Sequence, residues 1–111
     1  MIRSIAAASL ALVLTAPALA DDLPSDLAES RLRGCLLAGA SSADPIAGLE
    51  ATIIRVRAYC GAQLNRVRDQ RVAAATAGLK GSDAKAARDR ATRALNDEIA
   101  HAIANFSGLN Q

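Results

Sequence analysis

Apolar residues recur every three or four positions in three segments of the chain, which is the spacing of an amphipathic helix. No segment shows the alternation of polar and apolar residues that is typical of a strand. The first helical segment is expected from about 26 to 38, with Asp26 and Glu29 spaced as in a capping box and Gly39 as the stop. Its predicted apolar face consists of Ala28, Leu32, Cys35 and Leu36.

The second helical segment is the longest and is expected to run from about 45 to 77. Asp44 is its predicted N-cap, and Pro45 suits the first helical position because the missing amide hydrogen is not needed there. Gly61 is a weak point, since glycine costs about 1 kcal/mol relative to alanine inside a helix. It therefore marks either a bend or a close crossing with another helix. The predicted apolar stripe comprises Ile46, Leu49, Ile53, Val56, Cys60, Leu64 and Val67.

The third helical segment follows a short connection at 78–81, is capped by Ser82 or Asp83, and ends at Gly108. So short a connection makes the second and third helices antiparallel neighbours, and the first helix then covers their apolar edge. The prediction is an all-α fold, a small three-helix up-down-up arrangement built on a long antiparallel hairpin. The apolar face of the third helix comprises Ala84, Ala87, Ala91, Leu95, Ile99, Ala102, Ile103 and Phe106.

The first twenty residues have the layout of a cleavable export signal. Arg3 supplies a positive start, an apolar run covers 5–14, and the small-x-small sequence at 18–20 predicts cleavage after Ala20. The apolar run is about half of the roughly 20 residues that a membrane-spanning helix needs. We therefore expect a periplasmic or secreted protein without a membrane span, whose residues 21–111 form one helical domain.

Two cysteines, Cys35 and Cys60, remain after cleavage, and an exported protein usually joins such a pair. A disulfide needs its Cα atoms within about 7 Å. In a continuous second helix, however, Cys60 lies roughly 22 Å from the helix start, while Cys35 lies about 6 Å from the end of its own helix. An intramolecular disulfide is predicted if the loop lets the first helix slide back along the second. The alternatives are a break near Gly61 or a disulfide between two chains.

The charge of the chain is nearly balanced, with 13 basic and 11 acidic residues. Loss of Arg3 with the signal leaves a formal charge of +1, which gives no reason to expect nucleic-acid binding. The second helix is the most basic part, and its arginines divide between two faces. They are candidates for basic strips that contact anionic envelope material or an acidic protein, and they are Arg55, Arg57, Arg66, Arg68 and Arg71.

No sequence motif indicates catalysis, a cofactor or a metal. Glu98 and His101 have the Glu-x-x-His spacing of helical di-iron sites, but His101 is the only histidine, so one chain cannot complete such a site. A nucleophile elbow and a phosphate-binding glycine loop are also absent from the sequence. We predict no catalytic, cofactor-binding or metal-ligating residue and a protein that is not an enzyme.

These features together predict a non-enzymatic, exported helical module that binds a protein or has a structural role in the cell envelope. Its apolar stripes are narrow and bury too little surface for a large hydrophobic core, which favours an unknown protein partner or a homodimer. The alternative is a periplasmic stress or chaperone-like protein that shields unfolded polypeptides or makes weak contacts with anionic envelope components.

Overall fold

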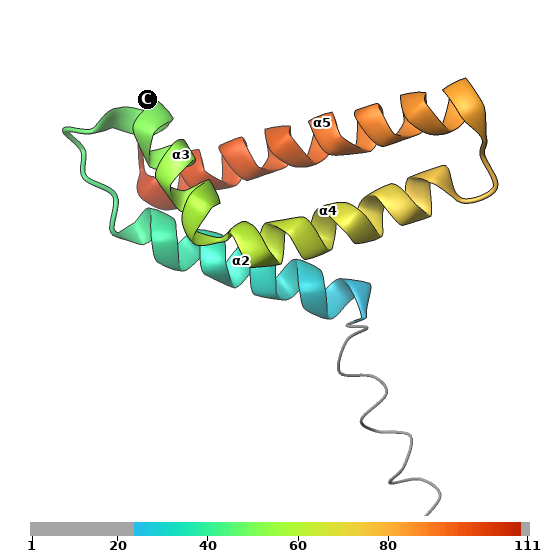
Figure 1. Ribbon diagram of the computed structural model, residues 1–111. Helices are drawn as coiled ribbons and strands as arrows, with labels where there is room; N and C mark the ends of the chain where they lie inside the picture. Colours follow the sequence, from blue (N-terminus) through green and yellow to red (C-terminus); the bar gives the residue numbers. More distant parts are fainter. Residues whose placement is uncertain (1–23, 110–111) are drawn as a thin grey trace, which may run out of the picture.

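The computed structural model describes residues 24–109, so the predicted export signal lies outside the described residues. Within them the chain forms four α-helices, namely α2 (Ser25–Ser41), α3 (Gly48–Tyr59), α4 (Gly61–Thr76) and α5 (Gly81–Ser107). No strand occurs between residues 24 and 109. The all-α class is confirmed. The predicted up-down-up arrangement of three helices is not, because the second predicted helix is divided into α3 and α4 (Figure 1).

The first helix begins within one residue of its predicted start, but its predicted cap and its predicted end are wrong. Pro24 occupies the N-cap position of α2, and no side chain caps the helix. Asp26 lies in the first turn, where its Oδ1 accepts a hydrogen bond of 3.1 Å from the amide of Leu27. The predicted capping box of Asp26 and Glu29 is therefore wrong. Gly39 does not end the helix either, since α2 continues to Ser41.

Gly39 has a different role, which is to let α3 cross α2 at close range. A Cβ atom at this position would lie 3.2 Å from Val56 Cγ1 and 3.3 Å from Tyr59 Cδ2. Both distances are shorter than ordinary van der Waals contact. The missing side chain therefore fixes how closely the two helices approach.

The start of the second predicted helix is also different in the structure. Asp44 Oδ1 accepts a hydrogen bond of 3.0 Å from Ile46, and the Asp44 carbonyl accepts one of 3.0 Å from Ala47. These bonds close a single turn, and Gly48 then adopts a left-handed φ of +85° before α3 continues. Asp44 and Pro45 consequently begin a turn instead of the helix. Ile46, predicted in the apolar stripe, is 94% exposed.

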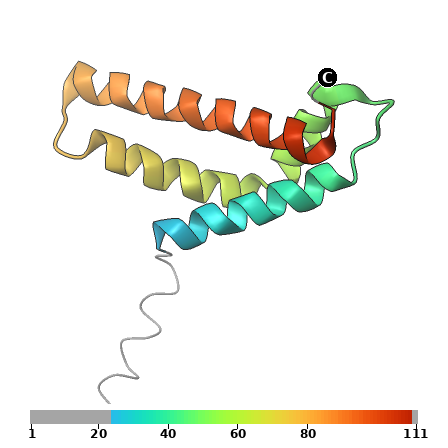
Figure 2. The same cartoon turned by 180° about the vertical axis from the view of Figure 1, so that it is seen from behind.

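The helix break at Cys60 decides the shape of the molecule. Cys60 has φ −99° and ψ 20°, and it separates Tyr59, the last residue of α3, from Gly61, the first of α4. Figures 1 and 2 show α3 leaving the line of α4 at this point and passing beside the C-terminal ends of α2 and α5. A break near Gly61 was one of the alternatives that the sequence left open, and it is the one that the structure adopts.

Helices α4 and α5 form a long hairpin, and α2 packs against both (Figures 1 and 2). The connection is the turn at 77–80, and α5 begins at Gly81 without a side-chain cap, so neither Ser82 nor Asp83 caps it. At the other end, Gly108 takes a left-handed φ of +74° and donates a hydrogen bond of 3.1 Å to the Ala104 carbonyl. The predicted stop at Gly108 is confirmed.

The core lies where α2 covers the hairpin. It is mostly aliphatic, and all of its main residues except Ala40 belong to the predicted apolar faces. These residues are Ala28, Leu32, Leu36, Ala40, Val56, Cys60, Leu64, Val67, Leu95, Ile99 and Ile103. Thr52 is the buried polar residue of the described chain, and its hydroxyl donates to the Gly48 carbonyl at 2.7 Å. Toward the hairpin turn, α4 buries nothing after Val67, and the first half of α5 buries only Ala87. That end of the hairpin therefore consists of two helices alone.

Among residues 24–109, none of the helices has both the length and the apolar character needed to cross a membrane.

Candidate functional site

A disulfide joins Cys35 of α2 to Cys60 at the helix break, with the Cα atoms 5.9 Å apart. Cys60 is completely buried. Because the break turns α3 across α2, the first helix reaches Cys60 without the long slide that a continuous helix would require. The disulfide thus fastens α2 to the junction between α3 and α4.

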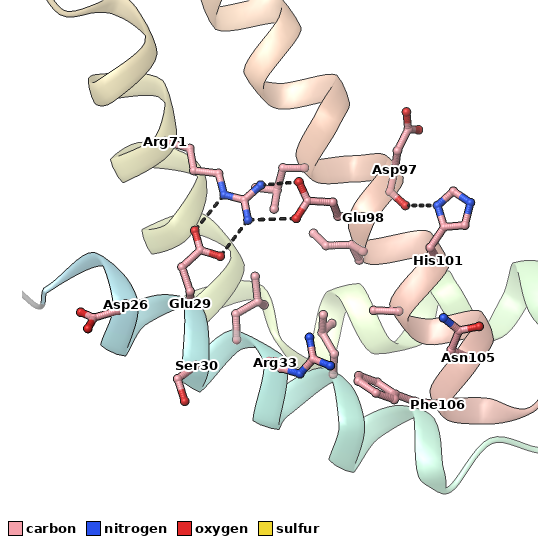
Figure 3. Close-up of a pocket in the computed structure, with 15 residues that line it drawn as sticks. Asp26, Glu29, Ser30, Arg33, Arg71, Asp97, Glu98, His101, Asn105 and Phe106 are labelled. Carbon is pink, nitrogen blue, oxygen red and sulfur yellow. Dashed lines mark hydrogen bonds and ion pairs between the residues drawn. The ribbon is translucent and has the colours of Figure 1, made fainter.

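A second connection fastens α2 to the hairpin, and it is made by Arg71 of α4. Its guanidinium donates to Glu29 of α2 through Nε at 2.8 Å and through Nη2 at 2.7 Å. It also donates to Glu98 of α5 through Nη1 at 2.7 Å and through Nη2 at 3.0 Å. Figure 3 shows the guanidinium between the two carboxylates. We call these three residues the Arg71 triad.

The Arg71 triad uses the planar fork of arginine twice, which a lysine could not reproduce. The hydrogen bonds that Arg71 donates to Glu29 and Glu98 raise the pKa of Arg71 above its ordinary value, and the same bonds to Glu98 lower the pKa of that carboxyl group. The side chains of Arg71, Glu29 and Glu98 are 28%, 39% and 58% exposed. Solvent therefore screens the triad, and each ion pair contributes only about 0.2–1 kcal/mol to stability.

A groove of about 700 Å³ lies between α2 and α5, with the Arg71 triad at one end. Its polar residues include Ser30 and Asn105 (Figure 3). Its apolar floor combines core residues with the half-buried Ala102 and Phe106. The apolar residues that line it are Leu32, Leu36, Leu95, Ile99, Ala102 and Phe106. We call it the α2–α5 groove.

The charges around the α2–α5 groove are unequal. Over the described residues, its lining holds four carboxylates and two guanidiniums, and the Arg71 triad already uses two of the carboxylates. Arg33 lies over the ring of Phe106, with its guanidinium carbon 5.6 Å from the ring centroid. Asp26 and Asp97 form no ion pair with any residue between 24 and 109. The groove therefore has a surplus of negative charge.

The Glu-x-x-His pair of the sequence lies on this groove, but its two side chains have separate partners. Glu98 binds Arg71, whereas His101 Nδ1 lies 2.8 Å from the Asp97 carbonyl of its own helix (Figure 3). Over the described part of the chain, no three His, Cys, Asp or Glu side chains gather in a way that could hold a metal ion.

The predicted basic strips are divided by the helix break. Arg55 and Arg57 lie on α3, while Arg66 and Arg68 lie on α4. Arg68 Nε is 3.7 Å from Asp69 Oδ1. Of the five arginines of the predicted strips, all within the described residues, Arg71 alone lines the α2–α5 groove.

Sequence reasoning missed the two carboxylate partners of Arg71. Glu29 is 42 residues away and Glu98 is 27 residues away along the chain. No local spacing rule connects such distant positions. The one available signal was the composition of each helix face next to the predicted core.

No protein-family model matches the chain, and comparison with curated proteins and with solved structures finds no match either.

Proposed function

We propose that the protein is a non-enzymatic, exported module of the cell envelope that binds a helical segment of another protein in the α2–α5 groove. The observation that carries the proposal is the groove itself, in which an apolar floor is bordered by unpaired carboxylates. A groove between two helices with an apolar floor suits an amphipathic helix laid in it. The export signal predicted in the sequence and the disulfide are compatible with an oxidising compartment.

The charge surplus of the groove indicates the chemistry of the partner. Asp26 lies on α2 and Asp97 on α5, so the unpaired carboxylates border the groove on both helices. A partner helix with lysine or arginine beside its apolar face would neutralise both, and complementary charge also speeds association. Phe106 and Ala102, half-buried in the free protein, supply the apolar contacts. The proposed partner is therefore a basic amphipathic helix.

Site-specific photocrosslinking in intact envelope tests this proposal. A photoreactive amino acid replaces Asn105, which is exposed on the groove, and in a control protein it replaces Ala74, which is exposed on α4 outside the groove. We expect an adduct from position 105 alone, and its mass spectrum should identify a basic helical peptide. The D26N/D97N variant should weaken that adduct.

Three results would count against the proposal. Equal adducts from positions 105 and 74 would show that the partner does not bind the groove in preference to the rest of the surface. An undiminished adduct in D26N/D97N would remove the charge argument. An adduct with a second copy of this chain would replace the partner protein with a homodimer.

The chaperone-like alternative rests on a different surface. Ile46 and Ile54 are large apolar residues exposed just before α3 and on it, and Tyr59 is exposed at its end. Exposed apolar side chains of this kind can hold unfolded polypeptides. Suppression of the aggregation of a reduced client protein tests this function, and we expect the I54S/Y59S variant to suppress less. A wild-type protein that leaves aggregation unchanged rules out this alternative.

A further inference from the structure

We propose that Arg31 of α2 and Arg66 of α4 form a binding site for a phosphate group. The two arginines line a hollow of about 140 Å³, together with Ala28, Ala62 and Gln63. Arg66 belongs to the predicted basic strips, but Arg31 does not, and only the packing of α2 against α4 brings the two together.

The charges of this hollow are uncompensated. Both arginine side chains are exposed, and neither forms an ion pair with another residue between 24 and 109. Arg68 and Arg71, by contrast, both have carboxylate partners. Among residues 24–109, none that lines the hollow carries a carboxylate. Two cations facing one space repel each other, so an anion bound between them would be stabilised by both.

The disulfide and the Arg71 triad hold α2 and α4 together on either side of Arg31 and Arg66. Along α2, Arg31 lies between Glu29 and Cys35, and along α4, Arg66 lies between Cys60 and Arg71. The disulfide joins the two helices on one side of the hollow, and the Arg71 triad joins them on the other. Such bracketing keeps the spacing of the helices constant. A ligand then binds a preorganised site and loses little affinity to ordering of the protein.

The size and chemistry of the hollow suit a phosphate group. Since one water molecule occupies about 30 Å³ of liquid, 140 Å³ is the space of four or five waters, comparable to the five heavy atoms of a phosphate. Each guanidinium can donate two parallel hydrogen bonds to phosphate oxygens. The Gln63 amide adds a donor, and Ala28 and Ala62 leave the space open. Free phosphate, a sugar phosphate and a lipid headgroup share this chemistry.

The site is independent of the proposed protein-binding groove. Arg31 and Arg33 are two positions apart on α2, which places them about 200° apart around the helix. Arg33 lines the α2–α5 groove, whereas Arg31 lines the hollow against α4. Loss of phosphate binding would therefore leave the groove proposal unaffected, and the reverse also holds.

Titration with inorganic phosphate, followed by amide chemical shifts at constant ionic strength, tests the site. We expect saturable shifts around Arg31 and Arg66, with a dissociation constant at least about tenfold higher in R31Q/R66Q. The R31K/R66K variant keeps the charge but loses the planar guanidinium groups that donate paired hydrogen bonds, so its affinity for phosphate should lie between those of the wild type and R31Q/R66Q. R55Q/R90Q removes the same charge from two exposed arginines on other helices, and its affinity should stay within about twofold of the wild type.

Thermal unfolding of the wild-type protein gives a measurement that needs no variant. Phosphate that binds the folded state should raise Tm above the value in chloride of equal ionic strength. Vesicles containing phosphatidylglycerol provide a second arm. If the wild-type protein is retained on these vesicles, and if R31Q/R66Q or added phosphate abolishes the retention, a lipid headgroup is the ligand. If the protein binds phosphate but is not retained on the vesicles, the ligand is a soluble phosphate.

The proposal is wrong if phosphate produces no saturable shifts and no rise in Tm. It is equally wrong if R55Q/R90Q weakens binding as much as R31Q/R66Q, because the effect then comes from net charge. Shifts that centre on Arg33 or Arg71 would place the anion in the α2–α5 groove and also overturn it.

Discussion

Reduction of the disulfide between Cys35 and Cys60 should remove a large part of the stability of this protein. The two cysteines are separated by 25 positions along the chain. Closing a loop of that length lowers the entropy of the unfolded chain by an amount equivalent to about 3.5 kcal/mol at 25 °C. Small domains have total stabilities of about 5–15 kcal/mol. The reduced protein should therefore melt about 14–28 °C lower than the oxidised protein, at about 4–8 °C for each kcal/mol.

The assay is thermal and urea unfolding followed by helical circular dichroism, with oxidised and reduced protein at the same pH. The C35A/C60A variant serves as a control that lacks reactive thiols. Alanine is preferable to serine because Cys60 is completely buried, and an unsatisfied hydroxyl there would cost a further 1–3 kcal/mol or so. We expect the variant and the reduced wild type to agree. A loss below about 1 kcal/mol would refute the reasoning, since it would mean that the unfolded chain gains little freedom when the bridge opens.

Three further predictions concern the Arg71 triad, the core and the helix crossing. Because the pKa of Glu98 is lowered in the folded protein, the ionised Glu98 stabilises the fold fully at pH values above 4.5, the ordinary pKa of the group. This stabilisation is lost as the pH falls through the lowered pKa, so the urea midpoints of the wild type and E98Q should converge in acid. A pH-independent difference would contradict this. Ile99→Ala should lower the free energy of unfolding by about 2–5 kcal/mol in urea titrations, because Ile99 is fully buried, and a loss below 1 kcal/mol or so would show that the core collapses around the gap. Gly34→Ala should stabilise α2 by about 1 kcal/mol in the same titrations, whereas Gly39→Ala should gain less or destabilise, since only a Cβ at Gly39 meets α3. Equal effects would contradict the close crossing.

The helical faces could be predicted from the sequence because they depend on local periodicity. In α5 the positions expected to be apolar and inward include Leu95, Ile99 and Ile103, and all three are buried. Within a helix, residues three or four apart share a face regardless of what packs against it. The stop at Gly108 was equally local, since it depends on the φ of one residue.

The two interruptions of the second predicted helix could not be located because the apolar period continues through them. Val56, Cys60 and Leu64 keep helical spacing across the break, so the pattern alone favours one straight helix. Gly61 indicated a possible break, because glycine destabilises a helix interior, and the Cα separation that a disulfide requires strengthened this alternative. Gly48, whose left-handed φ moves the start of α3, gave no distinct signal beside Pro45.

The candidate sites were less predictable than the fold, because both depend on contacts between helices. Arg71 was expected on a basic strip that contacts an external anionic partner, yet it binds Glu29 of α2 and Glu98 of α5. The pairing of Arg31 with Arg66 likewise exists only because α2 and α4 pack at a fixed spacing. Composition and charge identify the residue types of such sites, and tertiary packing decides which of them meet.

The two-helix end of the hairpin has a consequence for how the native protein fluctuates. Helix α5 is continuous from Gly81 to Ser107, and its residues that border the α2–α5 groove lie between Leu95 and Phe106, in its second half. Amide hydrogen exchange should therefore slow progressively along this one helix, with fast exchange near Ala84 and global protection near Ile103. The protein would then open from the hairpin tip inward, and a protease that cuts near Leu79 would act on that partly opened form while the rest of the molecule remained folded.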